Sequence, residues 1–159
     1  MPRGKNKVKP RELAPDPIYN SELVHYLINV VMWRGKKNAA RKIVYEAMSI
    51  LEKRVGSQEK ALELFYQAYD QVVPLVEVRS RRVGGSVYQI PREVNSQRRR
   101  ALAIRWLLSG AKSRSQKTMG ARLGAELLDA VEGRGGAMKK RLDVHKMAEA
   151  NRAFSHFAW

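Results

Sequence analysis

The side chains that most often carry catalysis or bind a metal are few and scattered in this sequence. The three histidines, His25, His145 and His156, lie in different segments and have no carboxylate at metal-ligand spacing. There is no cysteine, which excludes disulfides and thiolate metal sites. Neither Gly-Gly pair lies between a strand and a helix in the pattern of a phosphate-binding loop. These residues predict no enzyme, no cofactor and no small-molecule substrate.

Basic side chains are the chemistry that this chain offers in quantity. Thirty-one Lys and Arg residues against fifteen Asp and Glu residues give a formal net charge of +16. The richest stretch, RSRRVGGSVYQIPREVNSQRRR, runs from Arg79 to Arg100 and holds seven arginines and a single acid. Solubility requires far less charge, and such self-repulsion is usually tolerated when a polyanion neutralises it. The composition therefore indicates a nucleic-acid-binding protein.

The basic residues fall into clusters along the chain, and each cluster is a candidate for phosphate contacts. They are the N-terminal arm (Arg3, Lys5, Lys7, Lys9, Arg11), the first interhelical loop (Arg34, Gly35, Lys36, Lys37, Arg41), a predicted ribbon (Arg79, Arg81, Arg82), the helix behind it (Arg92, Arg98, Arg99, Arg100) and the following loop (Lys112, Arg114, Lys117).

One region departs from this pattern. Between Ile43 and Val78, six acids and three bases give a net charge of −3, so the rest of the chain carries +19. We expect this region to lie away from the polyanion. The sequence leaves open whether it faces solvent or a neighbouring protein.

The elements that must position these clusters are mainly helical. Ser21 is the expected N-cap of a first helix that ends at Arg34-Gly35, and a second helix closes at Gly56. Ser57 caps a third helix, which Pro74 ends. The period then changes to that of a strand over 75–82, and Gly84-Gly85 turns the chain into a return strand over 86–90.

Three more helices are expected after this ribbon. Pro91 is the predicted first residue of the fourth, with Trp106 on the face away from the core, and Ser109-Gly110 is its predicted end. The fifth contains Gly120 and Gly124, which would destabilise it unless another backbone approaches closely. The sixth begins near Ala137. Its first turns carry Lys139, Lys140 and Arg141, which oppose the helix dipole and predict an external anion there.

The predicted fold class is therefore mainly α: a six-helix bundle with a protruding two-stranded β-hairpin arm and a flexible basic N-terminal arm. Residues 1–17 form the arm, which has too few apolar residues to pack before it binds RNA. Residues 18–159 form a single domain with the hairpin at 75–90 and a C-terminal helix and tail at 137–159. No apolar run approaches the ~20 residues that span a bilayer, and the N-terminus lacks the hydrophobic core of a secretory signal.

Several stretches together resemble the bacterial-type small-subunit ribosomal protein seven family over essentially the whole chain. They are Ser21-Glu22-Leu23 with Leu27-Ile28, then Gly35-Lys36-Lys37, then Ile43-Val44 and Ala47; VGGSVYQIP; SRSQKTMGARL; and GRGGAMKKRLDVHKMAEANRAFSHFAW. Gly120 and Gly124 stand where larger residues are common in the family, which leaves the local helix packing open.

The resemblance implies a structural protein that is a primary binder of the 3′ major domain of 16S-type ribosomal RNA and nucleates assembly of the small-subunit head. The basic clusters above would contact that RNA, and neighbouring head and platform proteins would contact the domain. It also implies proximity to exit-site transfer RNA and messenger RNA, at Arg82, Val83, Gly84, Gly85, Lys139 and Lys140. Some bacterial members repress their own messenger RNA, and the resemblance does not decide whether this chain does. The expected location is a ribosome, in the cytoplasm or in an organelle that encodes its own.

Two other readings stay open from the residues alone. An architectural protein that compacts DNA would have the same charge, and it would bind duplex DNA as well as structured RNA. An enzyme with an unrecognised site is the third, although the sequence offers it no residues.

Overall fold

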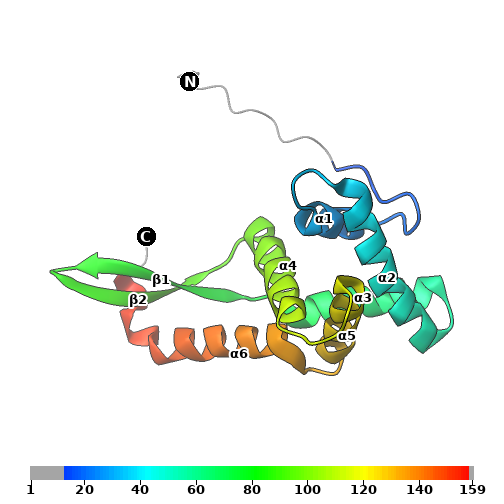
Figure 1. The fold of residues 1–159 in the computed structure, drawn as a ribbon. Coiled ribbons are helices and arrows are strands. Elements are labelled where there is room, and N and C mark those ends of the chain that lie inside the picture. The colour runs from blue at the N-terminus through cyan, green and yellow to red at the C-terminus, as the bar shows by residue number, and fades with distance from the viewer. Residues whose placement is uncertain (1–12, 158–159) are drawn as a thin grey trace, which may run out of the picture.

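The computed structural model describes residues 13–157 and confirms a mainly helical fold with a projecting hairpin (Figure 1). The elements in chain order are α1 (Glu22–Val31), α2 (Lys37–Val55), α3 (Gln58–Val72), β1 (Val76–Val83), β2 (Ser86–Glu93), α4 (Ser96–Lys112), α5 (Met119–Val131), α6 (Gly135–Ala150) and the 3-10 helix η1 (Arg152–Phe157). No helix within these residues is both long enough and apolar enough to cross a membrane.

Ser21, Gly56 and Ser57 lie at helix ends as predicted, but α1 ends at Val31, three residues before the predicted end at Arg34-Gly35. The Ser21 hydroxyl accepts a hydrogen bond from the Val24 N–H, and the Ser57 hydroxyl accepts one from the Lys60 N–H. Gly56 ends α2 with φ of 78°, a left-handed conformation that glycine adopts without strain. These caps are satisfied within a few residues, so local sequence is enough to specify them.

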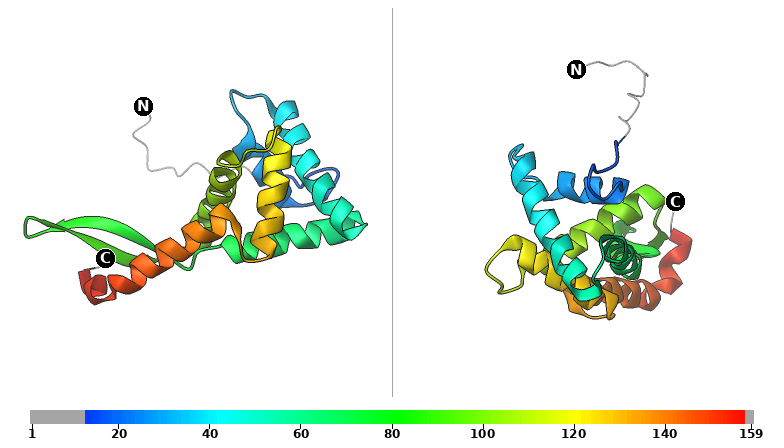
Figure 2. Two further views of the ribbon diagram at one scale, coloured as in Figure 1. Left: turned by 60° about the horizontal axis from the view of Figure 1, so that its bottom comes forward. Right: turned by 90° about the vertical axis from the view of Figure 1, so that its right-hand side faces the viewer.

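The hydrophobic core lies where α2, α3 and α4 surround α5. Phe65, Met48, Leu107 and Leu127 are fully buried there. α5 contacts all three of these helices and also α6. The helical body thus forms one end of the molecule, and the hairpin extends from the other end with α6 running along it (Figures 1 and 2).

The two glycines of α5 face α2, as their cost in an isolated helix predicted. A Cβ atom on Gly124 would lie 2.8 Å from Ile50 Cδ1 and 3.3 Å from the Ala47 carbonyl oxygen. A Cβ atom on Gly120 would collide with the Glu46 side chain. The close approach of α2 therefore explains both glycines, and packing offsets their low helix propensity.

Gly124→Leu is expected to destabilise the protein by about 1–3 kcal/mol, because the added side chain must push α2 and α5 apart. Removing the facing side chain in the double variant Gly124→Leu/Ile50→Ala should restore part of the loss. Urea unfolding midpoints of the two variants and the wild type measure both effects. Equal midpoints for Gly124→Leu and wild type would show that α5 can shift freely.

The hairpin is longer than the sequence predicts, and the assignment of Pro91 to the start of a helix is wrong. β2 continues to Glu93, and Pro91 pairs with Val78 in the antiparallel register. Proline is tolerated because each strand of a two-stranded sheet has one unpaired edge, where a missing N–H costs nothing. α4 instead begins at Ser96, where the Asn95 side chain accepts a hydrogen bond from the Arg98 N–H.

α4 also differs from prediction at its other end. It continues through Ser109 and Gly110 to Lys112, so the predicted stop is wrong. Gly110 is buried, and a Cβ there would collide with the Glu126 side chain and lie 3.1 Å from the Ala137 nitrogen. Gly110 is thus a contact point between helices. Trp106, predicted on the outer face, is only 8% exposed and belongs to the core.

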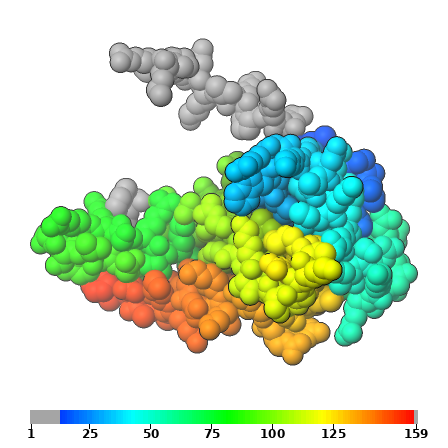
Figure 3. All heavy atoms as spheres, in the orientation of Figure 1, coloured from blue at the N-terminus to red at the C-terminus, as the bar shows by residue number. Residues whose placement is uncertain are grey.

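The C-terminal segment braces the hairpin. The Tyr88 ring of β2 lies 5.0 Å from the Phe154 ring and 5.7 Å from the Phe157 ring, both in η1. At the hairpin base, the Leu75 N–H donates to His145 Nε2 of α6. Burial and the nearby Arg141 charge lower the pKa of His145, which keeps its imidazole neutral and able to accept. The hairpin therefore rests on α6 and η1, as the space-filling view shows (Figure 3).

The segment before α1 contains a buried acid. Asp16 is 2% exposed, and its carboxylate accepts hydrogen bonds from the Ile18 and Tyr19 N–H groups and from the Tyr45 hydroxyl. Burial and this hydrogen bond raise the pKa of Tyr45 to about 12. Asp16 therefore holds this segment against α2, while Ala14, Pro15 and Pro17 are exposed. The basic residues Arg3 to Arg11 fall outside the described residues.

Candidate nucleic-acid interface

The loop between α1 and α2 presents cations around an uncapped helix N-terminus. Arg34 and Gly35 both have positive φ, 51° and 75°, which turns the chain sharply into α2. No side chain caps α2, and its first turn contains no acid. Arg34 and Lys36 are exposed. A helix N-terminus attracts anions through its free N–H groups and its dipole, so this loop is suited to a phosphate group.

Two further cations adjoin this loop. The Lys37 ammonium lies 2.9 Å from His25 Nε2 of α1. The Arg41 Nε atom is buried without a hydrogen-bond partner among the described residues. None of Arg34, Lys36, Lys37 and Arg41 forms an ion pair with an acid in residues 13–157. Their charge is therefore not compensated within that part of the chain.

Arginines of the hairpin and of α4 meet at one buried acid. Glu77 of β1 is 7% exposed; its Oε1 lies 2.8 Å from Arg79 Nε and its Oε2 lies 2.7 Å from Arg98 Nε. Two of the basic clusters predicted from the sequence, on the ribbon and on the helix behind it, therefore meet at this carboxylate. Glu77 neutralises part of their charge.

The other predicted arginines of this region have more local contacts. The Arg99 Nε donates to the Val94 carbonyl, and the Arg100 guanidinium lies 4.5 Å from the centre of the Tyr26 ring of α1. Arg81 donates to the Phe157 carbonyl of η1. Arg92 is exposed at the hairpin base, where it lines a shallow hollow with His145 and Arg152.

The hairpin tip extends away from the helical body (Figures 1 and 3). Gly84 and Gly85 have φ of 56° and 89°, as a tight two-residue turn requires, and Arg82 Nε donates to the Gly85 carbonyl. Arg82, Gly84 and Gly85 are exposed, and Val83 is half-buried. Lys139 and Lys140 are exposed on α6.

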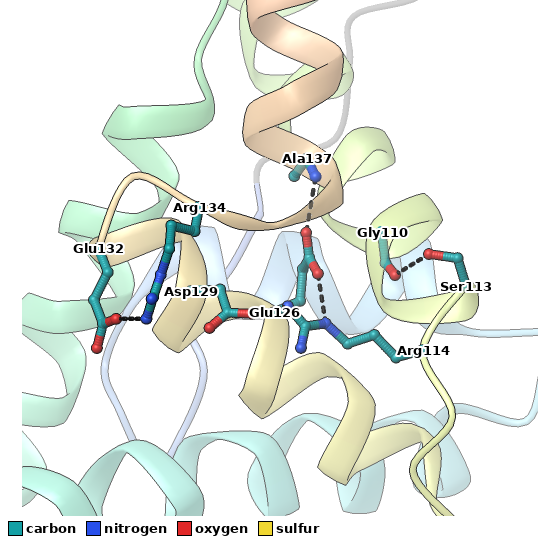
Figure 4. Close-up of polar contacts among 8 residues, drawn as sticks. All are labelled: Gly110, Ser113, Arg114, Glu126, Asp129, Glu132, Arg134 and Ala137. Atoms are coloured by element: carbon teal, nitrogen blue, oxygen red, sulfur yellow. Dashed lines mark hydrogen bonds and ion pairs between the residues drawn. The ribbon is translucent and has the colours of Figure 1, made fainter.

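The last residue of α4 and the loop after it provide two kinds of cation. Lys112 and Lys117 are exposed and form no ion pair with a described acid. Arg114 instead points inward: its Nε lies 2.6 Å from Glu126 Oε2, and its Nη2 contacts Asp129 (Figure 4). Burial alone lowers the pKa of Arg114, but the hydrogen bonds that it donates to Asp129 and Glu126 outweigh this effect and raise the pKa. The Arg114 charge is thus committed within the protein.

Glu126 of α5 is a buried acid. Glutamate is mostly exposed in proteins, yet Glu126 is 1% exposed. Its second oxygen, Oε1, accepts a hydrogen bond of 2.8 Å from the Ala137 N–H in the first turn of α6 (Figure 4). An internal carboxylate therefore stabilises the N-terminus of α6, where an external anion was predicted.

Sequence reasoning also left three surface residues out of the predicted site. Tyr26 and Arg105 lie along the contact between α1 and α4, and Trp33 beside the basic loop is 70% exposed. Tyr26 and Val30 are four residues apart on α1, and Arg105 and Lys112 are seven apart on α4. This spacing places each pair on one helical face and could have indicated a shared surface.

Comparison with known proteins identifies the family. A family model described as "Ribosomal protein S7p/S5e" matches residues 2–152. The chain is 53% identical over 159 residues to the small ribosomal subunit protein uS7 of Acidobacterium capsulatum, and 52% identical to that of Acidiphilium cryptum, with complete coverage of all chains. The chain belongs to the ribosomal protein S7p/S5e family. It is also 55% identical to uS7 of Rhodopseudomonas palustris over 94% of both chains.

Membership of the S7p/S5e family shows the general role of this protein. The chain is a structural, non-enzymatic protein of the small ribosomal subunit and associates with ribosomal RNA. Within the described residues, no group of three or more His, Asp or Glu side chains could hold a metal ion. The basic surfaces described above are the candidate contacts with that RNA.

Proposed function

We propose that this protein is a primary binder of 16S-type ribosomal RNA in its 3′ major domain and that it nucleates assembly of the small-subunit head. The observation that carries the proposal is the cationic loop around the uncapped N-terminus of α2, whose charges have no acidic partner among residues 13–157. A rigid core positions this loop, the outer side of α4, and the exposed Lys112 and Lys117. These surfaces can therefore bind several RNA segments in a fixed arrangement.

The hairpin and α6 suit a second role near exit-site transfer RNA and messenger RNA. Arg82 at the tip, and Lys139 and Lys140 on α6, are exposed, and the bracing by η1 fixes the direction of the hairpin. A supported arm can reach nucleic acid beyond the surface that the body covers. The turn between α2 and α3 lies at the opposite end (Figure 1). It belongs to the region from Ile43 to Val78, whose net charge is −3, and this region suits solvent or a neighbouring head or platform protein.

An architectural DNA-binding protein is the competing proposal, and competition separates the two. The protein should bind a fragment of the 3′ major domain of 16S-type RNA, and excess duplex DNA of equal length should not displace it. DNA displacing the fragment as well as unlabelled RNA does would favour the competitor.

Replacing the α1–α2 loop cations should weaken this binding without unfolding the protein. We expect Arg34→Ala/Lys36→Ala/Lys37→Ala to lower RNA affinity about 10- to 1,000-fold, if each cation contributes roughly 0.5–1.4 kcal/mol as an exposed phosphate contact. Filter binding at fixed salt measures the affinity, and circular dichroism checks the helical content.

The matched control removes the same charge elsewhere. Lys53, Arg54 and Lys60 are exposed at the α2–α3 corner. Their triple alanine variant lowers the net charge by the same amount. Because these residues lie away from the proposed RNA surface, RNA affinity should fall less than about threefold. Equal losses in the two triple variants would mean that only net charge matters and that the loop is not a site.

A further inference from the structure

A groove between α1 and α4 combines apolar and cationic surfaces. The two helices contact each other (Figure 2). Tyr26 and Val30 of α1 and Ala101 and Leu108 of α4 provide its apolar lining, and Arg105 and Lys112 lie along the α4 side. From Ala101 to Lys112 the helix rises roughly 16 Å, so the groove has an extended floor.

The charges of the groove favour an anionic occupant. None of the residues that line it is acidic. Arg105 and Lys112 are exposed, and neither pairs with an acid in the described part of the chain. Arg100 stacks on the Tyr26 ring at 4.5 Å, which holds a third cation at the edge and orders the ring.

The apolar lining narrows the choice of anion. A phosphate of a paired helix needs only the cations, because the bases of a duplex are stacked inside it. Val30 is 40% exposed, and burying it together with Tyr26 requires a ligand with an apolar face. An unpaired nucleotide has both features: a flat base that packs against aromatic and aliphatic side chains, and a phosphate beside it.

We propose that this groove holds an unpaired nucleotide of the bound RNA, with its base against Tyr26 and Val30 and its phosphate between Arg105 and Lys112. The inference rests on the proposed RNA-binding function and adds to it a site that reads an unstacked base.

Filling the groove without removing a charge tests the proposal. Ala101→Leu places a larger side chain on the floor and leaves Arg100, Arg105 and Lys112 in place. Since one base stacked on a protein side chain contributes about 1–3 kcal/mol, affinity for the 16S-type fragment should fall roughly 5- to 150-fold. Ser109→Leu, at the exposed end of the groove, is a second filling variant should Ala101→Leu fold poorly.

A leucine elsewhere serves as the control. Gln67 is exposed on α3, so Gln67→Leu should bind RNA as the wild type does. In the wild type, 4-thiouridine in the RNA should crosslink to the peptide that contains Tyr26, and both filling variants should lose that crosslink.

Each outcome is decisive. Wild-type affinity in both folded filling variants, or RNA binding without a crosslink to the Tyr26 peptide, overturns the nucleotide site and leaves the proposed function intact. The nucleotide site is also overturned if filling the groove impairs only the binding of a neighbouring protein. If the wild type itself does not bind the fragment, the proposed function fails and the groove proposal fails with it.

Discussion

Glu126→Ala is expected to lower the free energy of unfolding by about 3–5 kcal/mol, since it removes one partner from a buried ion pair. The variant leaves Arg114 Nε and the Ala137 N–H without their acceptor, 2.6 and 2.8 Å away in the native protein, although Arg114 Nη2 keeps its contact with Asp129. For a chain of this length, the loss corresponds to a fall in Tm of roughly 6–20 °C. Differential scanning calorimetry and urea unfolding measure the two quantities.

The position of Glu126 explains why the loss should be large. Its carboxylate joins the loop after α4 to the first turn of α6, and three glycines surround it. Cβ atoms on Gly110 and Gly135 would approach Glu126 Oε1 too closely, and a Cβ on Gly136 would lie 3.2 Å from Gly110 Cα. The backbone is thus packed around this carboxylate, and it cannot collapse to fill the space that alanine leaves.

A neighbouring ion pair supplies the matched control. Glu132 pairs with Arg134, but both side chains are largely exposed, so Glu132→Ala should change stability by less than about 1 kcal/mol. The double variant Glu126→Ala/Arg114→Ala should lose less than the sum of its single variants, because neither charge is then left buried alone. Additive losses, or a loss for Glu126→Ala as small as for Glu132→Ala, would refute the assigned role.

Local rules predicted the elements well where the stabilising contact is itself local. Ser21, Ser57 and Gly56 lie at helix ends because their partners are within four residues. Gly124 of α5 could be predicted to face another backbone, since nothing within the helix compensates it, whereas Gly120 faces the Glu46 side chain. Pro91 shows the limit: the same residue fits a helix N-terminus and a strand edge, and pairing with Val78 decides between them.

The candidate site could be predicted only as a set of clusters, because charge is visible in sequence and its neutralisation is not. Lys112 and Arg114 are two residues apart and look equivalent, yet Arg114 binds two carboxylates of the next helix. Glu77 and Glu126 both look like surface acids, and contacts 11 to 21 residues away bury them. The fold therefore determines which cations remain available for RNA.

The salt dependence of RNA binding should therefore reflect the uncompensated cations and not the total of thirty-one. If six to ten phosphates are neutralised, log affinity should fall against log salt with a slope of roughly −5 to −9. Affinity should then fall by roughly 10³- to 10⁵-fold between about 50 and 200 mM salt, which is the largest change expected for this protein. Filter binding across a salt series measures the slope.

The two triple variants show which cations set that slope. Each lost phosphate contact should reduce its magnitude by about 1, so Arg34→Ala/Lys36→Ala/Lys37→Ala should flatten it by about 3. The control at Lys53, Arg54 and Lys60 should keep the wild-type slope, although its net charge is the same. A wild-type slope near zero would mean that RNA is held mainly by uncharged contacts, and that the excess of basic residues serves another purpose.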